Sequence, residues 1–329
     1  MLGVNLIKEC EKLIKPLVDD IRNVANDGKL YVAFSGGLDS SVVAALAKLA
    51  LGPERVELVT TRFRFTYPKT LKIVKEFSRL LDLKHTFVDA TEWQAKIWKS
   101  GPSCNACTRG PKLLSVKEYA NGNLVATGAE NEDTWGKCGL KIHNGFYSPL
   151  FSTSREEVKR IAECLKVKVD KIGENSGREG CMLKHLLKMM AVPNFHGAAV
   201  YKANVLLMDM IEKSKTKFSL ANVKIVGPLS KNIALVNLKP EPYEDFKKEV
   251  KKSIMAIEEI SDVVFVDKPV TLEVLANPGV FNNSASKYWI EHGRLAPDFS
   301  SNIRVKWRLS KNNRLTTFSV VSYEFNENS

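Results

Sequence analysis

The 329-residue sequence has no apolar run near the roughly 18 residues that a membrane-spanning helix needs. Residues 1–21 alternate charged with apolar side chains, unlike the continuous apolar segment of a signal peptide. Internal repeats and low-complexity linkers are also absent. We therefore expect a cytoplasmic protein with no membrane contact, long enough for two or three packed domains.

Acidic residues are outnumbered, with 37 Asp and Glu against 49 Lys and Arg, and the formal net charge is +12. Such a charge favours polyanionic partners such as RNA, although a Lys-rich composition also occurs without one. Only 6 cysteines are present. Because cysteines in a reducing compartment are more often metal ligands or reactive thiols than disulfides, we expect those two roles among them.

Short apolar runs alternate with amphipathic stretches along the first part of the chain. Strands are expected at 29–34, 55–63, 84–90 and 123–128, and helices at 9–25, 40–51 and 68–83. Strands that alternate with helices predict an α/β fold with a doubly wound parallel sheet. Ligands bind such sheets at the carboxyl ends of the strands.

The periodicity changes after about residue 218. Before this point, Ser154 and Glu157 form a capping-box pattern at the start of a helix. Further helices are expected at 177–190 and 201–215. Beyond it, strands at 222–227, 232–238 and 262–268, a helix at 243–260 and an alternating hairpin at 302–325 indicate a smaller α+β module.

The stretch SGGLDSS, residues 35–41, joins an expected strand to an expected helix. Such a turn presents backbone N–H groups at the positive end of the helix, and its glycines let an anion approach them. It therefore predicts a phosphate-binding loop. The spacing matches neither the P-loop nor the dinucleotide-binding fingerprint.

The loop resembles the S-G-G-x-D-S motif of the PP-loop superfamily, the N-type ATP pyrophosphatases. All five defined positions match, at Ser35, Gly36, Gly37, Asp39 and Ser40. The resemblance implies an adenine nucleotide alpha hydrolase-like fold that binds ATP and Mg²⁺ through these residues. It also implies transfer of AMP to an acceptor oxygen with release of pyrophosphate, with Asp39 in the catalytic centre.

Two further stretches fit the resemblance. Gly128, Asn131 and Asp133 follow the fourth strand, where relatives carry a Gly followed by an Asn or His and an acidic pair. Ala129 and Glu130 depart from that pattern. Thr61 ends the second strand, where this fold meets adenine. The predicted domains are an N-terminal helix at 1–27, a PP-loop ATP-binding domain with a cysteine site at 28–217, and an α+β module at 218–329 ending in a basic β-hairpin.

Cys104 and Cys107 form a C-x-x-C pair, and Cys181 precedes an expected helix. Without a second pair, these motifs cannot build a four-cysteine zinc site, whereas three thiolates suit an iron–sulfur cluster with one open iron. The order of these motifs resembles two branches of the superfamily: the iron–sulfur-dependent tRNA thiolation enzymes, and the sulfur transferase that builds the nickel-pincer cofactor of lactate racemase. The resemblance implies that the three cysteines hold a [4Fe–4S] cluster and that Cys181 is also catalytic.

The other cysteines and the histidines carry weaker signals. Cys10 and Cys164 are expected to be small buried side chains on their helices. Cys138 is expected to be a bystander, with a fourth ligand or a persulfide carrier as the alternative. A zinc site completed by His185 or His143 also stays open.

Several basic residues near these motifs could hold phosphates or form ordinary surface charge. They are Arg62, Arg64, Arg109, Lys112, Arg178 and Lys184. The C-terminal residues 304–314 interleave cations with Trp307. This pattern suits stacking on RNA but is equally natural on an exposed hairpin.

Three functions remain open. The first is ATP-dependent sulfur transfer through the cluster to a tRNA nucleobase, and the second is the same chemistry on a small nucleotide-like cofactor precursor. The third is an ATP-dependent amidating ligase with a structural zinc, against which the absence of a glutaminase-like domain argues. Net charge favours tRNA as the acceptor. The sequence does not fix the acceptor, the sulfur donor or the oligomeric state, for which a homodimer stays open.

Overall fold

The computed structural model describes residues 2–133, 137–169 and 180–326, with side chains from residue 8 onward. The chain divides into two compact units. Unit 1 comprises Met1–Phe63, Pro68–Ala90 and Thr108–Asp170, and unit 2 comprises Arg64–Tyr67, Thr91–Cys107 and Lys171–Ser329. The region 28–217, which was predicted to be one domain, is thus divided between them. All three expected ligand cysteines fall in unit 2.

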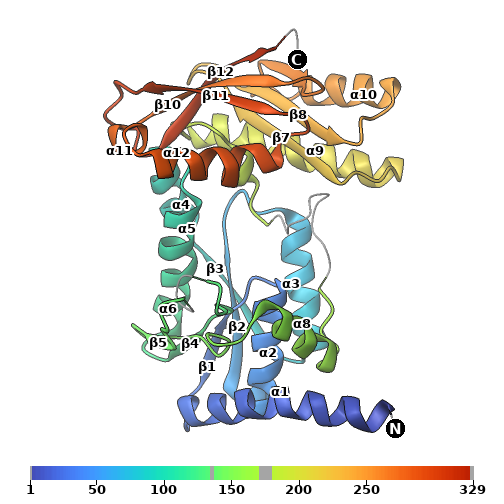
Figure 1. Ribbon diagram of the computed structural model, residues 1–329, viewed down its shortest axis with the longest axis vertical. Coiled ribbons are helices and arrows are strands. Elements are labelled where there is room, and N and C mark those ends of the chain that lie inside the picture. The colour runs from blue at the N-terminus through green and yellow to red at the C-terminus, as the bar shows by residue number, and fades with distance from the viewer. Residues whose placement is uncertain (1, 134–136, 170–179, 327–329) are drawn as a thin grey trace. The chain divides into compact units, whose positions relative to one another are not determined.

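Unit 1 is built around one six-stranded sheet. Its strands are β1 (Leu30–Ala33), β2 (Val56–Arg62), β3 (Lys84–Asp89), β4 (Leu124–Ala126), β5 (Ile142–His143) and β6 (Phe146–Tyr147). Its helices are α1 (Leu2–Ala25), α2 (Leu38–Leu51), α3 (Pro68–Leu80), α6 (Leu113–Ala120) and α8 (Arg155–Cys164), with short turns of helix at Pro53–Arg55 and Thr108–Lys112. The strand order is β3-β2-β1-β4-β6-β5, and only β5 runs antiparallel to its neighbour (Figure 1). The predicted α/β fold with a mostly parallel sheet is confirmed.

Helices cover both faces of this sheet. Successive side chains of a strand point to opposite faces, and the apolar side chains on each face are buried beneath helices. In β1, Leu30 and Val32 enter a core shared with α1, α2, α3 and α8, whereas Tyr31 and Ala33 face the core beneath α6. The chain order reverses between β1 and β4. The loops that follow these two strands therefore meet at the carboxyl edge of the sheet, where ligands bind in doubly wound folds.

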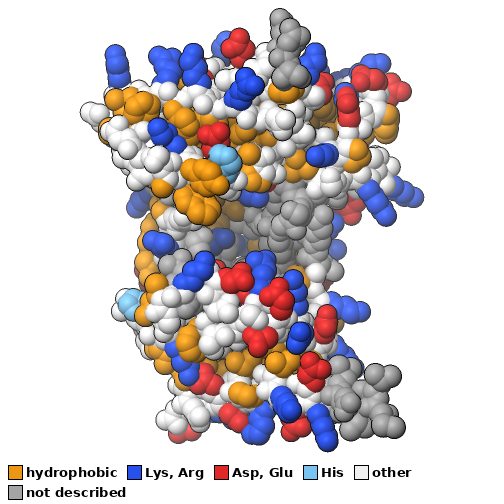
Figure 2. Space-filling view, in the orientation of Figure 1, with side chains coloured by type: hydrophobic (Ala, Val, Ile, Leu, Met, Phe, Trp, Pro, Cys, Tyr) orange, Lys and Arg blue, Asp and Glu red, His pale blue; other side chains and the backbone are white. Residues whose placement is uncertain are grey.

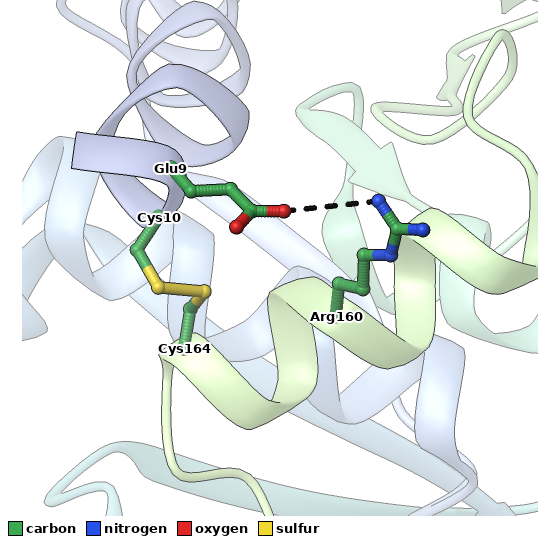
Figure 3. The surroundings of a disulfide bond; sticks show 4 residues. All are labelled: Glu9, Cys10, Arg160 and Cys164. Carbon is green, nitrogen blue, oxygen red and sulfur yellow. Dashed lines mark ion pairs between the residues drawn. A yellow bond between two sulfur atoms is a disulfide. The ribbon is translucent and has the colours of Figure 1, made fainter. Parts of the chain in front are cut away.

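A disulfide joins α1 to α8. Cys10 and Cys164 have Cα atoms 5.6 Å apart, and the ion pair of Glu9 and Arg160 lies beside them at 3.8 Å (Figure 3). The expectation of two small buried thiols is therefore wrong, as is the preference against disulfides for this pair. Helical periodicity placed each cysteine on its helix but could not show that the two helices pack against each other.

Unit 2 contains two three-stranded sheets that share a core. Its strands are β7 (Leu220–Val226), β8 (Ile233–Lys239), β9 (Asp262–Phe265), β10 (Val270–Ala276), β11 (Ile303–Leu309) and β12 (Phe318–Phe325). Its helices are α4 (Thr91–Trp98), α5 (Cys104–Cys107), α9 (Ala198–Ser214), α10 (Glu244–Met255), α11 (Pro278–Phe281) and α12 (Ser284–Ile290), with helical turns at Met182–His185, Pro193–Gly197, Glu291–Leu295 and Ala296–Asp298. The sheet orders are β7-β8-β9 and β11-β10-β12. Leu235 and Val226 of the first sheet pack with Val270 and Val320 of the second.

The predicted C-terminal hairpin is wrong. β11 and β12 are both strands, as the alternation indicates, but β10 lies between them, parallel to β11 and antiparallel to β12. Alternation identifies a strand and its buried face, but it does not identify the neighbouring strand. Because no sequence pattern had indicated β10, its two neighbours were expected to pair with each other.

The expected helix at 177–190 is also wrong over the described residues 180–190. Only Met182–His185 form a 3₁₀ turn, and extended bridges join Cys181 to Thr66 and Leu186 to Ile225. A continuous apolar run does not by itself distinguish a helix from a buried extended segment. Across the described ranges of both units, no helix is long and apolar enough to cross a membrane.

Candidate active site

The loop after β1 in unit 1 is held by its own serine hydroxyls. Ser35 Oγ and Ser40 Oγ lie 3.0 Å apart, and the Gly37 N–H donates to Ser35 Oγ at 3.2 Å. Gly36 has a φ of +68°, which favours glycine. Gly37 is the N-cap residue of α2 and has no side chain to cap it. The first N–H groups of α2 are therefore available to a bound anion.

The loop after β4 approaches this turn so closely that only glycine fits. A Cβ atom at Gly128 would lie 2.9 Å from the backbone N of Ser40 and 3.0 Å from Asp39 Cβ. Contacts this short with backbone atoms cannot be relieved by a side-chain rotation. The structure thus places the predicted Gly128 directly against the predicted phosphate loop.

Acidic side chains gather beside the same loop. Burial raises the pKa of Asp39, the Arg155 guanidinium opposes this shift, and the charge of Asp133 adds to it. Burial also raises the pKa of Glu130, and the negative charge of Asp39 adds to that shift. Asp133 Oδ2 in turn accepts a hydrogen bond from the Glu130 N–H at 3.2 Å. The site therefore concentrates negative charge that the described residues only partly compensate.

Two oxygen atoms at this site lack partners. Glu130 Oε2 and Asn131 Oδ1 are both buried and accept no hydrogen bond from any described residue. Buried polar atoms without partners are rare, and one explanation is a missing ligand or ion. Mg²⁺ is commonly held by one or two carboxylates together with substrate phosphates. Asp39 and Glu130 fit that donor set.

Glu130 and Arg155 are functional candidates that sequence reasoning missed. Glu130 was noted only as a departure from the family pattern, and Arg155 opens α8, far along the chain from the loop. The acidic run after β4 was the available signal for Glu130. No local signal pointed to Arg155, because its effect on Asp39 depends on the packing of α8.

Thr61 lies at the carboxyl end of β2, as predicted, but its hydroxyl is already engaged. It donates to the Lys112 carbonyl oxygen at 2.8 Å and lies 3.0 Å from Ser115 Oγ. Beside it, Thr60 Oγ1 lies 2.8 Å from His85 Nε2, and burial lowers the pKa of His85 to about 4. Adenine contact by Thr61 stays a prediction.

The thiols of unit 2 form a second polar cluster. The buried Gln94 side chain donates from Nε2 to Cys107 Sγ at 3.4 Å and to Cys181 Sγ at 3.6 Å. Cys104 instead accepts a hydrogen bond from Arg294 Nη1 at 3.1 Å. Segments far apart in sequence thus bring Cys107 and Cys181 to one amide group.

The geometry gives no support to the predicted cluster. Among the described residues, no group of three or more His, Cys, Asp or Glu side chains is placed to hold a metal ion. His185, an alternative zinc ligand, is fully buried with its Nδ1 2.9 Å from Lys224 Nζ. His143 contacts Asn144 at an exposed turn. Cys138 is exposed in unit 1 and forms no disulfide.

The predicted cations have varied surroundings. Lys184 pairs with Asp298 at 3.3 Å, Arg62 pairs with Asp89 at 3.2 Å, and Arg109 and Lys112 are exposed. Arg178 lies outside the described residues. Figure 2 shows Lys and Arg side chains on one face interspersed with Asp and Glu rather than gathered in one patch.

Trp307 does not interleave with the cations of β11. It packs against the core, as do Ile303 and Val305, while the alternating residues Arg304, Lys306 and Arg308 are exposed. Because successive side chains of a strand point to opposite faces, the aromatic ring and the cations are separated. The C-terminal stacking motif is therefore not formed.

The loop, the acidic residues and the mostly parallel sheet together resemble the phosphate-binding site of an α/β fold of the PP-loop type. Residues 8–126 match the family model described as NAD synthase, which is less than half of the chain. The NH(3)-dependent NAD(+) synthetase of Rhizobium rhizogenes is 24% identical over 160 residues, covering 44% of this chain and 48% of the relative. One component of the glutamine-hydrolyzing GMP synthase of Methanoculleus marisnigri is 36% identical over 175 residues, covering 46% and 55%.

The corresponding GMP synthase component of Thermococcus kodakarensis is 37% identical over 83 residues, covering 25% of this chain and 27% of the relative. The chain thus spans about half the length, or less, of these curated relatives. The matches support the PP-loop superfamily and an ATP-using enzyme. They do not support membership of the iron–sulfur sulfurtransferase branch.

Proposed function

We propose that this protein is an ATP-dependent adenylating enzyme that replaces an acceptor oxygen with sulfur. The phosphate loop of unit 1, beside an acidic site whose charge the described residues only partly compensate, supports the ATP-dependent step. The observation that favours sulfur is the pair of thiols, Cys107 and Cys181, held by one buried amide in unit 2.

In the first step, the acceptor oxygen bonds to the α-phosphorus of ATP, and the bond from that phosphorus to the bridging oxygen breaks, so pyrophosphate leaves. The free N–H groups at the start of α2 and the hydroxyls of Ser35 and Ser40 would bind the phosphates. Asp39 and Glu130 would hold Mg²⁺, which neutralises charge on the leaving pyrophosphate. In the second step, a sulfur nucleophile from an external donor bonds to the activated carbon, and AMP leaves with the oxygen.

A tRNA nucleobase is the proposed acceptor, supported by the net charge of +12 and by the exposed cations of β11. A small nucleotide-like cofactor precursor is the alternative. We derive no step through an iron–sulfur cluster, because the described cysteines do not form its ligand set.

An amidating ligase is the second candidate. The matched relatives include an NH(3)-dependent NAD(+) synthetase and glutamine-hydrolyzing GMP synthases. In that case ammonia, rather than sulfur, would displace AMP from the same kind of adenylate.

An assay with bulk tRNA and Mg-ATP distinguishes these functions. It is run once with sodium sulfide and once with ammonium chloride. We expect pyrophosphate release with sulfide, and mass spectrometry of the digested nucleosides should show one oxygen replaced by sulfur. Modification with ammonium but not sulfide would overturn the sulfur proposal in favour of the ligase. Asp39→Asn should abolish this activity, and Glu54→Gln, changed at an exposed acid of unit 1, is its control and should react like the wild type.

The thiol pair is tested separately with phenylarsine oxide, which condenses with two neighbouring thiols and releases water. We expect one arsenical per chain, lost in Cys107→Ser and in Cys181→Ser but retained in Cys138→Ser. Anaerobic reconstitution with iron and sulfide counting should find no cluster. Iron and labile sulfide that are lost in the Cys104, Cys107 and Cys181 variants would contradict the thiol arrangement described above.

A further inference from the structure

Unit 2 contains a cavity that the proposed ATP chemistry does not use. Its volume is about 270 Å³, and its lining includes Arg64, Phe65, Glu92, Gln94 and Asn194. Pockets for drug-sized ligands usually start at about 300 Å³. This cavity therefore suits a molecule smaller than most drug-sized ligands.

Two opposite charges line this small cavity without pairing with each other. The Arg64 guanidinium donates from Nη1 to Asn194 Oδ1 at 2.5 Å, which orients it, but it forms no ion pair with any described carboxylate. The Glu92 carboxylate forms neither an ion pair nor a hydrogen bond with the described residues. A guanidinium has five N–H donors, so most of them remain available to a ligand.

This arrangement fits a zwitterion better than an anion. A guanidinium binds a carboxylate through two parallel hydrogen bonds, and a carboxylate in turn accepts from an ammonium group. The negative charge of Glu92 disfavours a polyanion such as a nucleotide phosphate. An α-amino acid carries both required groups on one carbon atom.

The inner wall of the cavity indicates what kind of side chain the bound amino acid would carry. Phe65 and Met190 are buried and apolar, and Gln94 contributes the amide whose nitrogen contacts Cys107 Sγ and Cys181 Sγ. A Cβ atom at Gly197 would lie 2.4 Å from Phe65 and 2.9 Å from Met190 Sδ, so glycine is needed behind this wall. A short side chain with a sulfur atom suits these apolar and sulfur-rich surroundings.

We propose that this cavity is a binding site for a small zwitterionic α-amino acid of the cysteine class. Arg64 would bind its carboxylate and Glu92 its ammonium group. Use of the bound amino acid as a sulfur source would rest on the proposed function, whereas binding does not.

Calorimetry of the full chain without ATP tests the proposal. The probe is S-methyl-L-cysteine, whose blocked sulfur cannot exchange with the Cys10–Cys164 disulfide. Analogues are 2-(methylthio)ethylamine, which lacks the carboxylate, and 3-(methylthio)propionate, which lacks the amine. We expect the amino acid to bind at least roughly tenfold more tightly than either, as loss of a charge-assisted hydrogen bond predicts.

The variants assign each charge to its group. Arg64→Gln should weaken the amino acid roughly tenfold while leaving the amine analogue unchanged, and Glu92→Gln should leave the propionate analogue at least as tightly bound. Lys96→Gln, an exposed change on α4 that does not line the cavity, should bind like the wild type. Unchanged melting temperatures would show that the variants are folded.

Two results would overturn the proposal. One is the absence of heat with S-methyl-L-cysteine at concentrations near about 10 mM. The other is tighter binding of inorganic phosphate than of the amino acid, strengthened by Glu92→Gln, which would make the cavity an anion site. Because the assay contains neither ATP nor an acceptor, failure of the proposed sulfur transfer would leave its result unchanged.

Discussion

The two units differ in whether the polar groups of their candidate sites have hydrogen-bond partners among the described residues. In unit 1, Glu130 Oε2 and Asn131 Oδ1 are buried without a partner among the described residues, and burial raises the pKa of Asp39 and of Glu130. In unit 2, the Cys107 and Cys181 thiols share the amide of Gln94. The difference indicates that the unit 1 site is built to receive a ligand that supplies missing partners, whereas the thiols already have theirs.

Loss of the acidic site should have the largest effect. Asp39→Asn or Glu130→Gln should lower pyrophosphate release in the tRNA and sulfide assay roughly 100- to 1,000-fold, because each removes a carboxylate that would hold Mg²⁺ at the reacting phosphates. Cys107→Ser should leave acceptor-dependent pyrophosphate release within about threefold of wild type, because the thiol takes no part in the adenylation step. If the cysteine variant lost pyrophosphate release as completely as Asp39→Asn, the division of labour between the units would be refuted.

The disulfide extends the comparison to the cysteines themselves. Unit 1 closes a long loop with Cys10–Cys164, whereas Cys104, Cys107 and Cys181 of unit 2 form no disulfide. Reduction should lower the free energy of unfolding by about 2–4 kcal/mol, since the oxidised unfolded chain has less entropy. Chemical denaturation with and without dithiothreitol measures this effect. A Cys10→Ser variant should be insensitive to the reductant, and equal sensitivity in both proteins would show that the bond does not form.

A substitution at Gly128 tests how closely the loop after β4 must approach the phosphate loop after β1. Gly128→Ala should weaken Mg-ATP binding roughly tenfold, because the added methyl group displaces the backbone at Asp39 and Ser40. Gly122→Ala is a demanding control, since its φ of +86° strains the variant but no atom lies within 4 Å of the added Cβ. It should lower the melting temperature without changing ATP affinity. Equal loss of affinity in both variants would attribute the effect to general instability.

The parts of the fold that local patterns encode were predictable. The strands and helices around SGGLDSS follow from apolar runs and turn residues, and the Ser154–Glu157 capping box is present as the sequence indicates. Apart from the helix wrongly expected at 177–190, the errors concern partners at long range. Alternation could not reveal β10 between β11 and β12, and helical spacing could not reveal the approach of Cys10 to Cys164.

The candidate sites divide in the same way. The phosphate loop is contiguous, so its residues could be named from the sequence. Glu130 and Gln94 required the structure, because the importance of each depends on what is packed around it. Glu130 is singled out by a buried oxygen that lacks a partner among the described residues, and Gln94 by its contacts with two thiols from different segments of the chain.

The smallest predicted effect concerns the unliganded protein. Because the folded pKa of Asp39 is raised, its protonated carboxyl is favoured in the fold. The resulting contribution to stability is complete below the unfolded pKa, near about 4, and is lost as the pH rises through the folded pKa. At neutral pH the ionised carboxylate therefore costs stability, by no more than about 1 kcal/mol because partial exposure screens it.

Asp39→Asn should accordingly melt at a higher temperature than the wild type at pH 7, by roughly 2–4 °C for each kcal/mol. The difference should shrink as the pH falls from 7 toward about 4, because the raised pKa of Asp39 favours its protonated carboxyl increasingly over this range. Melting curves across this range measure it, with Asp245→Asn, at an exposed position on α10, as the matched control. The variant would thus be more stable and less active than the wild type. A lower melting temperature at pH 7 would show instead that Asp39 stabilises the empty loop, and that the acidic site is not held in readiness for a ligand.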